Sequence, residues 1–257
     1  IHAHDIPTEF PQAVLDQAGD AVPAPSERED LTQIPLITID PHDARDHDDA
    51  VYAEKLDDGW RVIVAIADVA AYVTEGSPLD KEALKRGNST YFPDRVVPML
   101  PFELSADECS LREGEPRCTL AVEMIFDTDG HKRSHRFIRG MMKSAAKLSY
   151  EEAQAAIDGK PGGKAGELLE TVLKPLWGAY AALGKARDKR APLDLDLPER
   201  RIMFKEDGEI DGIYTKERLE AHRLIEEFMI QANVAAAETL ERQKSPLIYR
   251  VHDTPTD

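Results

Sequence analysis

The chain has 257 residues, of which 42% are apolar and 32% charged, and its formal net charge is −17. These values are ordinary for a soluble globular protein with room for one large domain or two small ones. No stretch approaches 18 consecutive apolar residues, so we expect no membrane-spanning helix. Two cysteines, Cys109 and Cys118, are too few for a disulfide scaffold and favour a reducing cytoplasm. The acidic balance argues against broad nucleic-acid binding, although it leaves room for a local basic channel.

The first segment is predicted to be a connecting segment. PQAVLDQA predicts a short helix, and VPAPSERED, rich in proline and charge, predicts a linker. The chain begins without methionine, so we expect it to be a piece of a longer protein. Residues 1–35 are therefore interpreted as a linker and residues 36–257 as the main domain.

Five aspartates crowd the next segment, TIDPHDARDHDDAV: Asp40, Asp43, Asp46, Asp48 and Asp49. The apolar segments around them predict strands at 36–40, 50–56 and 60–68, the last two joined by an Asp-Gly turn. Crowded carboxylates repel one another and are costly to hold together unless a cation lies among them. Carboxylate oxygens on rigid strands are the ligands that Mg²⁺ or Mn²⁺ prefers, and such a site commonly serves phosphoryl transfer.

Two other interpretations of this run stay open from the residues alone, namely an acidic surface turn and a calcium loop. An EF-hand loop that began at Asp46 would place Ala50 at a ligand position and Val51 where glycine is needed. Asp57 at its twelfth position does not repair both failures, so the calcium loop is the weaker alternative.

The rest of the chain predicts a hairpin followed by long helices. PLDKEALKRG predicts a helix that stops at glycine, RCTLAVEMIFDTDGHKRSHRFI predicts an antiparallel hairpin, and residues 140–146 predict a further strand. SYEEAQAAIDG begins with a capping box formed by Ser149 and Glu152, and GKPGGKAG predicts a loop. LLETVLKPLWGAYAALGKARDKR predicts a helix interrupted at Pro175. A hairpin in RRIMFKEDGEIDGIY, a helix at 217–243 and a strand in PLIYRVHDTPTD follow, so the fold is predicted to be α+β, with a mostly antiparallel or mixed sheet packed against long helices.

Two stretches are basic despite the acidic composition. One contains Lys185, Arg187, Lys189 and Arg190, and the other runs from His131 to Arg139. Each is interpreted as a solvated face rather than a binding groove.

The chain resembles the ribonuclease II / ribonuclease R family over nearly its whole length. The matching blocks, in order, are TIDPHDARDHDDAV, VAIADVAAYV, STYFPDRVVPMLP, CSL, AKLSYEEA, AHRLIEEFMIQAN and YRVHDTP. The resemblance implies the N-terminal part of an exoribonuclease II-type catalytic domain, incomplete in this chain, after a linker from an oligonucleotide-binding domain. It also implies a processive 3′→5′ exoribonuclease that uses Mg²⁺, or Mn²⁺ in its place, to hydrolyse single-stranded RNA to nucleoside 5′-monophosphates. We expect a cytoplasmic, monomeric protein of RNA degradation without an obligate protein partner.

The resemblance also implies roles for individual residues. Asp40, Asp46, Asp48 and Asp49 are implied to hold the metal, and the residues implied to act at the scissile phosphate are Asp46, Asp48, Tyr150 and Glu226. Tyr91 is implied to stack on the last bases of the RNA, Glu226 to contact the 3′-terminal base, and His252 to touch the RNA backbone. On the helical stripe, Glu226 is expected in a partly buried polar site beside His222. Without the resemblance, the tyrosines would be packing residues, Glu226 a solvated residue and His252 a structural histidine.

The chain departs from the family pattern in several places. Leu195 stands where a base-stacking phenylalanine is frequent, and His47 stands where an aromatic residue or methionine is common. The family's catalytic domain continues past the position of Asp257, with an arginine-rich segment and an S1-type RNA-binding domain. We therefore expect the isolated chain to be a poor enzyme or none. The competing hypotheses are an RNA-binding module with deficient catalysis and a structural calcium-binding protein.

Overall fold

The computed structural model of the chain describes residues 6–189, 200–205, 207–215 and 217–249. The helices are α1 (Gln12–Gly19), η2 (Val69–Ala71, a 3₁₀ turn), α2 (Pro78–Arg86), η3 (Leu104–Glu108, a π-helix), α3 (Tyr150–Ile157), α4 (Gly163–Glu167), η4 (Leu169–Leu173, a π-helix), α5 (Lys174–Lys189) and α6 (Glu220–Arg242). The strands are β1 (Glu29–Asp30), β2 (Ile37–Asp40), β3 (Asp49–Leu56), β4 (Gly59–Ala67), β5 (Thr90–Tyr91), β6 (Val96–Val97), β7 (Pro116–Asp127), β8 (Lys132–Lys143), β9 (Ala146–Ser149), β10 (Arg200–Phe204) and β11 (Ile210–Thr215).

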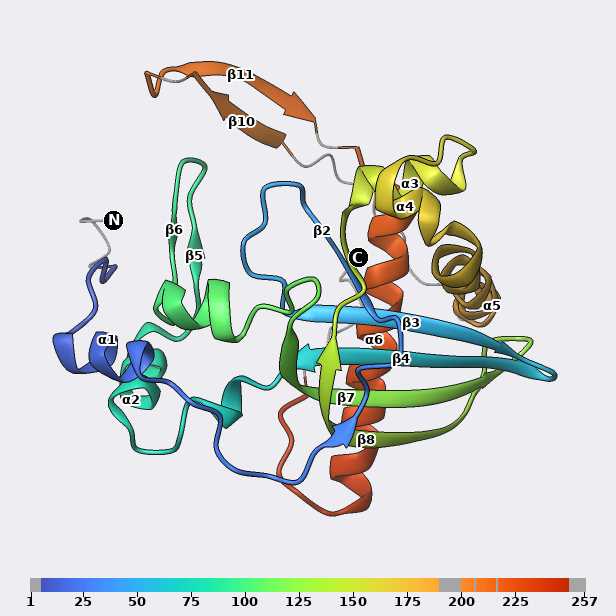
Figure 1. The fold of residues 1–257 in the computed structure, drawn as a ribbon, viewed down its shortest axis with the longest axis horizontal. Helices are drawn as coiled ribbons and strands as arrows, with labels where there is room; N and C mark the ends of the chain where they lie inside the picture. The colour runs from blue at the N-terminus through green and yellow to red at the C-terminus, as the bar shows by residue number, and fades with distance from the viewer. Residues whose placement is uncertain (1–5, 190–199, 206, 216, 250–257) are drawn as a thin grey trace, which may run out of the picture.

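A seven-stranded mixed sheet lies at the centre, in the order β1-β8-β7-β4-β3-β2-β9 (Figure 1). The strands from β8 to β2 pair antiparallel, and short turns join β3 to β4 and β7 to β8. The two edge strands pair parallel, β1 with β8 and β9 with β2. The expected α+β fold, with a mixed sheet packed against long helices, is confirmed.

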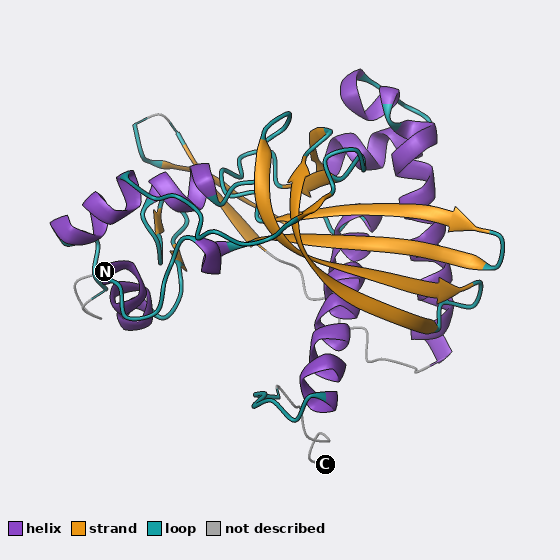
Figure 2. Ribbon diagram, turned by 60° about the horizontal axis from the view of Figure 1, so that its bottom comes forward, coloured by secondary structure: helices purple, strands orange, loops and turns teal. Residues whose placement is uncertain are grey.

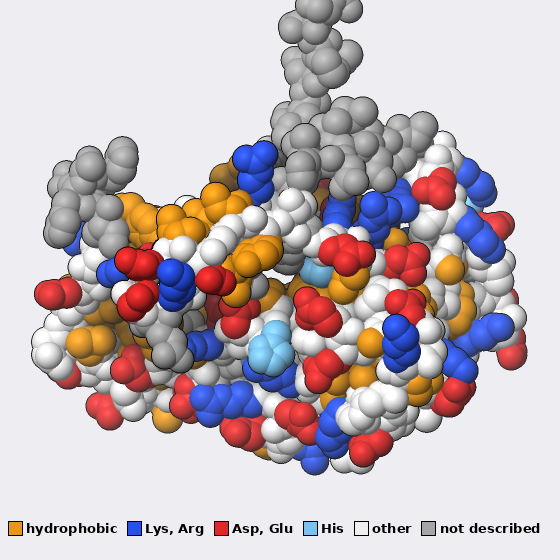
Figure 3. Space-filling model, turned by 90° about the horizontal axis from the view of Figure 1, so that it is seen from above, with side chains coloured by type: hydrophobic (Ala, Val, Ile, Leu, Met, Phe, Trp, Pro, Cys, Tyr) orange, Lys and Arg blue, Asp and Glu red, His pale blue; other side chains and the backbone are white. Residues whose placement is uncertain are grey.

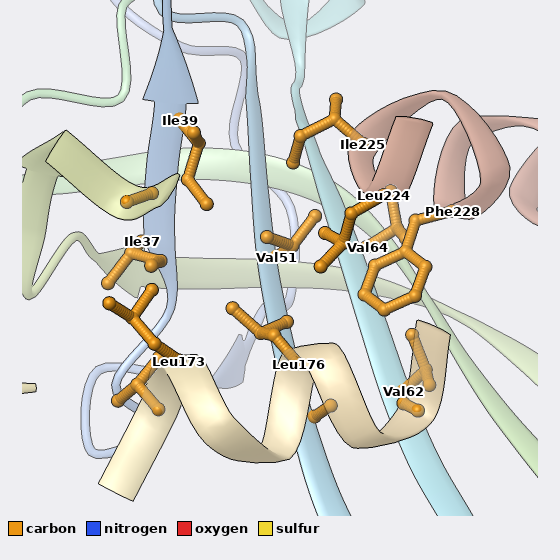
Figure 4. Packing of buried hydrophobic residues seen from close by; sticks show 14 of the residues in the cluster. Ile37, Ile39, Val51, Val62, Val64, Leu173, Leu176, Leu224, Ile225 and Phe228 are labelled. Carbon is orange, nitrogen blue, oxygen red and sulfur yellow. The ribbon is translucent and has the colours of Figure 1, made fainter. Parts of the chain in front are cut away.

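Both faces of the sheet are buried under other elements. Val62 and Val64 of β4 join the core beneath the helices of the second half, whereas Ile63 and Ala65 point to a second core on the α1–α2 side. Figure 4 shows the first core, where side chains of α5 and α6, including Phe228, lie against β2, β3 and β4. Burial on both faces explains the nearly continuous apolar sequence of β4.

Local sequence signals fix the ends of several elements. Ser149 Oγ accepts a hydrogen bond from the Glu152 amide at 3.1 Å, and Glu152 Oε2 accepts one from the Ser149 amide at 2.8 Å. The predicted capping box therefore starts α3. Pro175 lies at the second residue of α5, directly after the π-helix η4, which confirms an interruption of the helical pattern at that point.

Two short hairpins stand beside the central sheet. One pairs β5 with β6, and the other pairs β10 with β11. The second hairpin projects from the body in both ribbon views (Figures 1 and 2). Together with the β2–β3 connection, these hairpins approach the end of the sheet that carries the aspartate run (Figure 1).

Three local predictions need correction. The segment GKPGGKAG contains the short helix α4 and is not wholly a loop. Glu29 and Asp30 pair with β8 and so extend the main sheet from within the predicted linker. Residues 246–249 form no strand, and the rest of the strand predicted there lies outside the described residues. No helix among the described residues is long and apolar enough to span a membrane.

Candidate active site

The β2–β3 connection carries the aspartate run and holds it at one end of the sheet. Asp40 is the last residue of β2 and Asp49 the first of β3, while Asp46 and Asp48 lie in the connection between them. Ile37 pairs with Val51 across these antiparallel strands, so both ends of the connection start from rigid backbone. The four aspartates implied to hold a metal are thus anchored close together.

The parallel edge strand β9 adds Tyr150 to this group. Asp40 is in register with Ser149, and Tyr150 follows directly as the first residue of α3. Burial raises the pKa of the Tyr150 hydroxyl, and the nearby carboxylates of Asp49, Asp40 and Asp48 raise it further. The phenol therefore keeps its proton at neutral pH and can donate a hydrogen bond.

His47 forms a buried pair with Asp40. Its Nδ1 lies 2.7 Å from Asp40 Oδ2, and only 5% and 11% of the two side chains are exposed. The His47 backbone is held as well, because its amide donates to Ser110 Oγ and its carbonyl accepts from the Leu111 amide. His47 is therefore a fixed neighbour of an implied metal ligand, a role that the sequence alone did not reveal.

The carboxylate of Asp49 is buried without compensation. Its Oδ2 atom has no hydrogen-bond partner among the residues that the structure describes. Burial and repulsion from Asp40 and Asp48 raise the pKa of Asp49 to about 7. Burial also raises the pKa of Asp48, with Asp46 and Asp40 adding to the effect. The cluster thus pays an electrostatic cost that a bound cation would relieve.

Tyr91 lies on the solvent side of the same cluster. Its hydroxyl donates a hydrogen bond of 3.5 Å to Asp46 Oδ2, and 66% of the residue is exposed. Burial of its hydroxyl and the charges of Asp46 and Asp48 raise the pKa of Tyr91. The ring is therefore accessible to a ligand while the hydroxyl stays tied to the aspartate run.

The start of α6 packs against Tyr150. The rings of His222 and Tyr150 are stacked, with centroids 3.9 Å apart and planes 13° from parallel. The Ala221 amide donates to Gln154 Oε1 at 3.0 Å, which fixes α6 against α3. His222 thus supports the face of Tyr150, a contact that helical spacing in the sequence could not predict.

Glu226 lies one helical turn beyond His222 but points to solvent. Its side chain is 53% exposed and forms an ion pair with Arg218. The expectation of a partly buried position is wrong, because the buried face of α6 is formed by other residues, including Glu227 and Phe228. His252 and Leu195 lie outside the described residues.

The chemistry of these side chains fits a hard divalent cation. The four aspartates offer oxygen ligands, one buried oxygen has no hydrogen-bond partner in the described ranges, and two of the carboxyl groups have raised pKa values. Within the described part of the chain, however, no three such side chains are arranged closely enough to hold an ion. The donor set is therefore present, whereas a closed coordination shell is not.

The surface above the cluster is acidic with an apolar border. Figure 3 shows this face from above, with Asp and Glu side chains gathered around its middle beside a band of hydrophobic side chains. Such a surface suits a cation first and an anionic substrate only once the cation is bound.

A family model described as the RNB domain matches residues 28–257. The chain belongs to the RNB family. Among its curated relatives, ribonuclease R of Vibrio parahaemolyticus is 42% identical over 267 residues, covering 99% of the chain and 31% of the relative. Ribonuclease R of Escherichia coli is 41% identical over 268 residues, covering 100% of the chain and 32% of the relative. The chain thus spans about a third of the length of these RNB relatives.

Solved RNB structures have the same fold. Mycoplasma genitalium RNase R in complex with ribose-methylated single-stranded RNA superimposes with a TM-score of 0.92 at 31% identity, over 98% of the chain and 40% of that protein. Yeast Ssd1, described as a pseudonuclease, superimposes with a TM-score of 0.66 at 18% identity, over 87% of the chain and 28% of that protein. The second likeness concerns the fold alone.

Proposed function

We propose that this chain is the aspartate-bearing part of a 3′→5′ exoribonuclease that degrades single-stranded RNA processively to nucleoside 5′-monophosphates. The observation that carries the proposal is the meeting of the aspartate run, in which Asp40 is buried, with Tyr150 and the exposed ring of Tyr91 at one end of the sheet. The ribonuclease R relatives and the RNA-bound Mycoplasma structure support it. We further propose a monomeric protein of the cytoplasm.

The proposed cofactor is Mg²⁺, with Mn²⁺ as the alternative, held by Asp40, Asp46, Asp48 and Asp49. A divalent ion at this place would neutralise charge that develops on the scissile phosphate and lower the pKa of a bound water. Burial and the repulsion between neighbouring carboxylates, which together raise the pKa values of Asp48 and Asp49, favour its binding. A bound cation would also contact the buried Oδ2 atom of Asp49, which has no hydrogen-bond partner among the described residues.

The side chains around the cluster can receive the 3′ end of an RNA strand. The protonated hydroxyl of Tyr150 is suited to donate a hydrogen bond to a phosphate oxygen. The exposed ring of Tyr91 is suited to stack on a base, an interaction that accepts every base because each has a π-face. Contacts to the ribose 2′-hydroxyl would provide preference for RNA over DNA. We propose Glu226 and His252 as contacts to the terminal base and to the backbone, respectively.

An RNA-binding module without turnover is the second candidate. It is favoured by the absence, within the described ranges, of three carboxylates positioned to hold a metal. The likeness in fold to a pseudonuclease shows that this architecture also occurs without nuclease activity. Metal-dependent cleavage separates the two candidates.

The deciding experiment is degradation of a 5′-labelled single-stranded RNA by the full-length protein, with Mg²⁺ and with EDTA. The exoribonuclease gives a ladder that shortens from the 3′ end only with metal, and thin-layer chromatography identifies nucleoside 5′-monophosphates. Tight binding without any shortening in Mg²⁺ or Mn²⁺ would assign the protein to the binding-module class.

A further inference from the structure

The two basic stretches of the sequence meet in one cavity. A cavity of about 620 Å³ lies between the start of β8, the end of α5 and the last turns of α6. Lys132 and Arg133 come from one stretch, Lys189 comes from the other, and Arg242 comes from α6. Segments about fifty residues apart in the chain thus contribute cations to the same hollow.

The lining is positive although the whole chain carries a charge of −17. Among its described lining residues, four side chains are cations and Glu238 is the one carboxylate. Arg133 also pairs with Asp58 at the rim. Lys189 and Arg242 are exposed and form no ion pair with any residue in the described ranges. Positive charge concentrated in a concave surface attracts anions more strongly than the same charge on a flat face.

Lys132 supplies a buried ammonium that the protein only partly satisfies. Its side chain is 10% exposed, and its Nζ lies 2.9 Å from Glu238 Oε2. Among the described residues, the ammonium has no hydrogen-bond partner beyond this ion pair with Glu238. An ammonium has three N–H donors, and leaving them unmade in a buried place is costly. An acceptor group in the cavity would satisfy them.

His135 lies at the base of the same cavity. Its Nε2 is 2.7 Å from Thr239 Oγ1, and its Nδ1 is 3.5 Å from Glu238 Oε2. Burial lowers the pKa of His135, and Lys132 lowers it further despite the opposing charge of Glu238. The imidazole is therefore neutral at pH 7, and the positive field of the lining outweighs its single carboxylate at this point.

The cavity is separate from the aspartate cluster. Across the sheet, Asp49 is level with Ile66, Leu120 and Arg139. Lys132 and His135 lie four to seven residues before Arg139 on β8, a distance of about 13–23 Å along the strand. The end of α6 that borders the cavity also lies away from the β2–β3 connection (Figure 1).

We propose that this cavity, which we call the basic pocket, is a second binding site that takes a phosphate group. Its volume is within the range of pockets for a nucleotide-sized ligand, and a phosphate supplies both the charge and the acceptor oxygens that Lys132 lacks. The phosphate can come from the backbone of an RNA strand or from a free nucleotide. The RNA source rests on the proposed function, whereas the nucleotide source does not.

The test measures binding in EDTA, so that it does not depend on cleavage. The full-length protein and the variant Lys189→Gln/Arg242→Gln are titrated with a 2′-O-methyl RNA 12-mer by fluorescence anisotropy and with uridine 5′-monophosphate by calorimetry. Lys81→Gln/Lys160→Gln, which removes the same charge from exposed lysines outside the pocket, is the matched control. These four side chains are exposed, so folding is expected to survive both double changes, and circular dichroism checks it.

If the pocket binds an RNA phosphate, the variant Lys189→Gln/Arg242→Gln should bind the RNA about 3–10-fold more weakly at 0.1 M salt. Its affinity should also depend less on salt, and the control variant should show neither change. Loss of uridine 5′-monophosphate binding with unchanged RNA affinity assigns it to a free nucleotide. Equal affinities of the pocket variant, the control variant and the unchanged protein for both the RNA and uridine 5′-monophosphate would overturn the proposal. Such a result would leave the proposed exoribonuclease untouched, because metal-dependent shortening of RNA is measured separately.

Discussion

His47 Nδ1 lies 2.7 Å from Asp40 Oδ2 in a position where both side chains are almost fully buried. The contact fixes one oxygen of Asp40 and leaves the other free to bind a ligand. Histidine–carboxylate contacts of this kind commonly orient groups around metal sites. We therefore interpret His47 as a positioning residue of the proposed metal site.

Replacing His47 should weaken metal binding more than it disturbs the fold. His47→Phe keeps a buried ring but leaves Asp40 Oδ2 without a donor, and we expect a loss of about 10–100-fold in Mg²⁺ or Mn²⁺ affinity. Calorimetric titration of the full-length protein measures this loss directly. His47→Asn, which retains a side-chain donor, should recover part of the affinity. Equal metal affinities for both variants and the unchanged protein would exclude the positioning role.

Asp49 should make the metal-free protein less stable as the pH rises. Its pKa is about 7 in the folded state and near 4 when exposed, so its stabilising contribution is complete below pH 4 and is lost as the pH rises through 7. Asp49→Asn removes the charge, and we expect the free energy of unfolding of the metal-free variant to be about 1–3 kcal/mol higher than that of the unchanged protein at pH 8.

The extra stability of the Asp49→Asn variant should shrink at lower pH. Denaturant unfolding in EDTA at pH 8, 6 and 4 measures the free energy of unfolding of both proteins, and the difference between them should approach zero at pH 4. Added Mg²⁺ should stabilise the unchanged protein at pH 8 but not the variant. A variant less stable than the unchanged protein at pH 8 would contradict the buried charge.

Asp48→Asn should abolish cleavage and preserve RNA binding. Removing one charge from a crowded carboxylate site disturbs the metal more than it disturbs the surface that receives RNA. Activity gels and anisotropy measurements on the full-length protein separate the two effects. Cleavage at the normal rate would remove Asp48 from the proposed catalytic residues.

Tyr91→Ala should loosen the grip on the 3′ end of RNA. The exposed ring is free to stack, and loss of one stacked base costs about 1–3 kcal/mol, or about 5–150-fold in affinity. Tyr91→Phe keeps the ring but loses the hydroxyl bond to Asp46, so its affinity should stay near that of the unchanged protein. If the phenylalanine variant binds as weakly as the alanine variant, the hydroxyl and not the ring carries the interaction.

Much of the local structure could be predicted from the sequence, because its signals are short-range. The hairpin of β3 and β4, the capping box at Ser149 and the break at Pro175 each depend on residues close together in the chain, although the β3–β4 turn is formed by Asp57 and Asp58 and Gly59 already lies in β4. The aspartate run could also be recognised as a candidate metal site from the sequence, because closely spaced carboxylates repel one another unless a cation lies among them.

The contacts that complete the site could not be predicted in the same way. The pairing of β2 with β9 and the stacking of His222 on Tyr150 join distant segments, and helical spacing does not show which face of α6 is buried. The spacing therefore misplaced Glu226, which is exposed. The two basic stretches were interpreted separately because the sequence does not show that β8 and α5 converge on one cavity.

The pairing of Asp40 with Ser149 has a consequence for the order in which the chain folds. The hairpins β3–β4 and β7–β8 can form from nearby contacts, whereas β2 meets β9 only after about a hundred intervening residues are in place. Before that closure, water surrounds the aspartates and screens their mutual repulsion. The final approach of β9 and α3 therefore carries the electrostatic penalty, and divalent cations present during folding should speed this late step rather than the early hairpins.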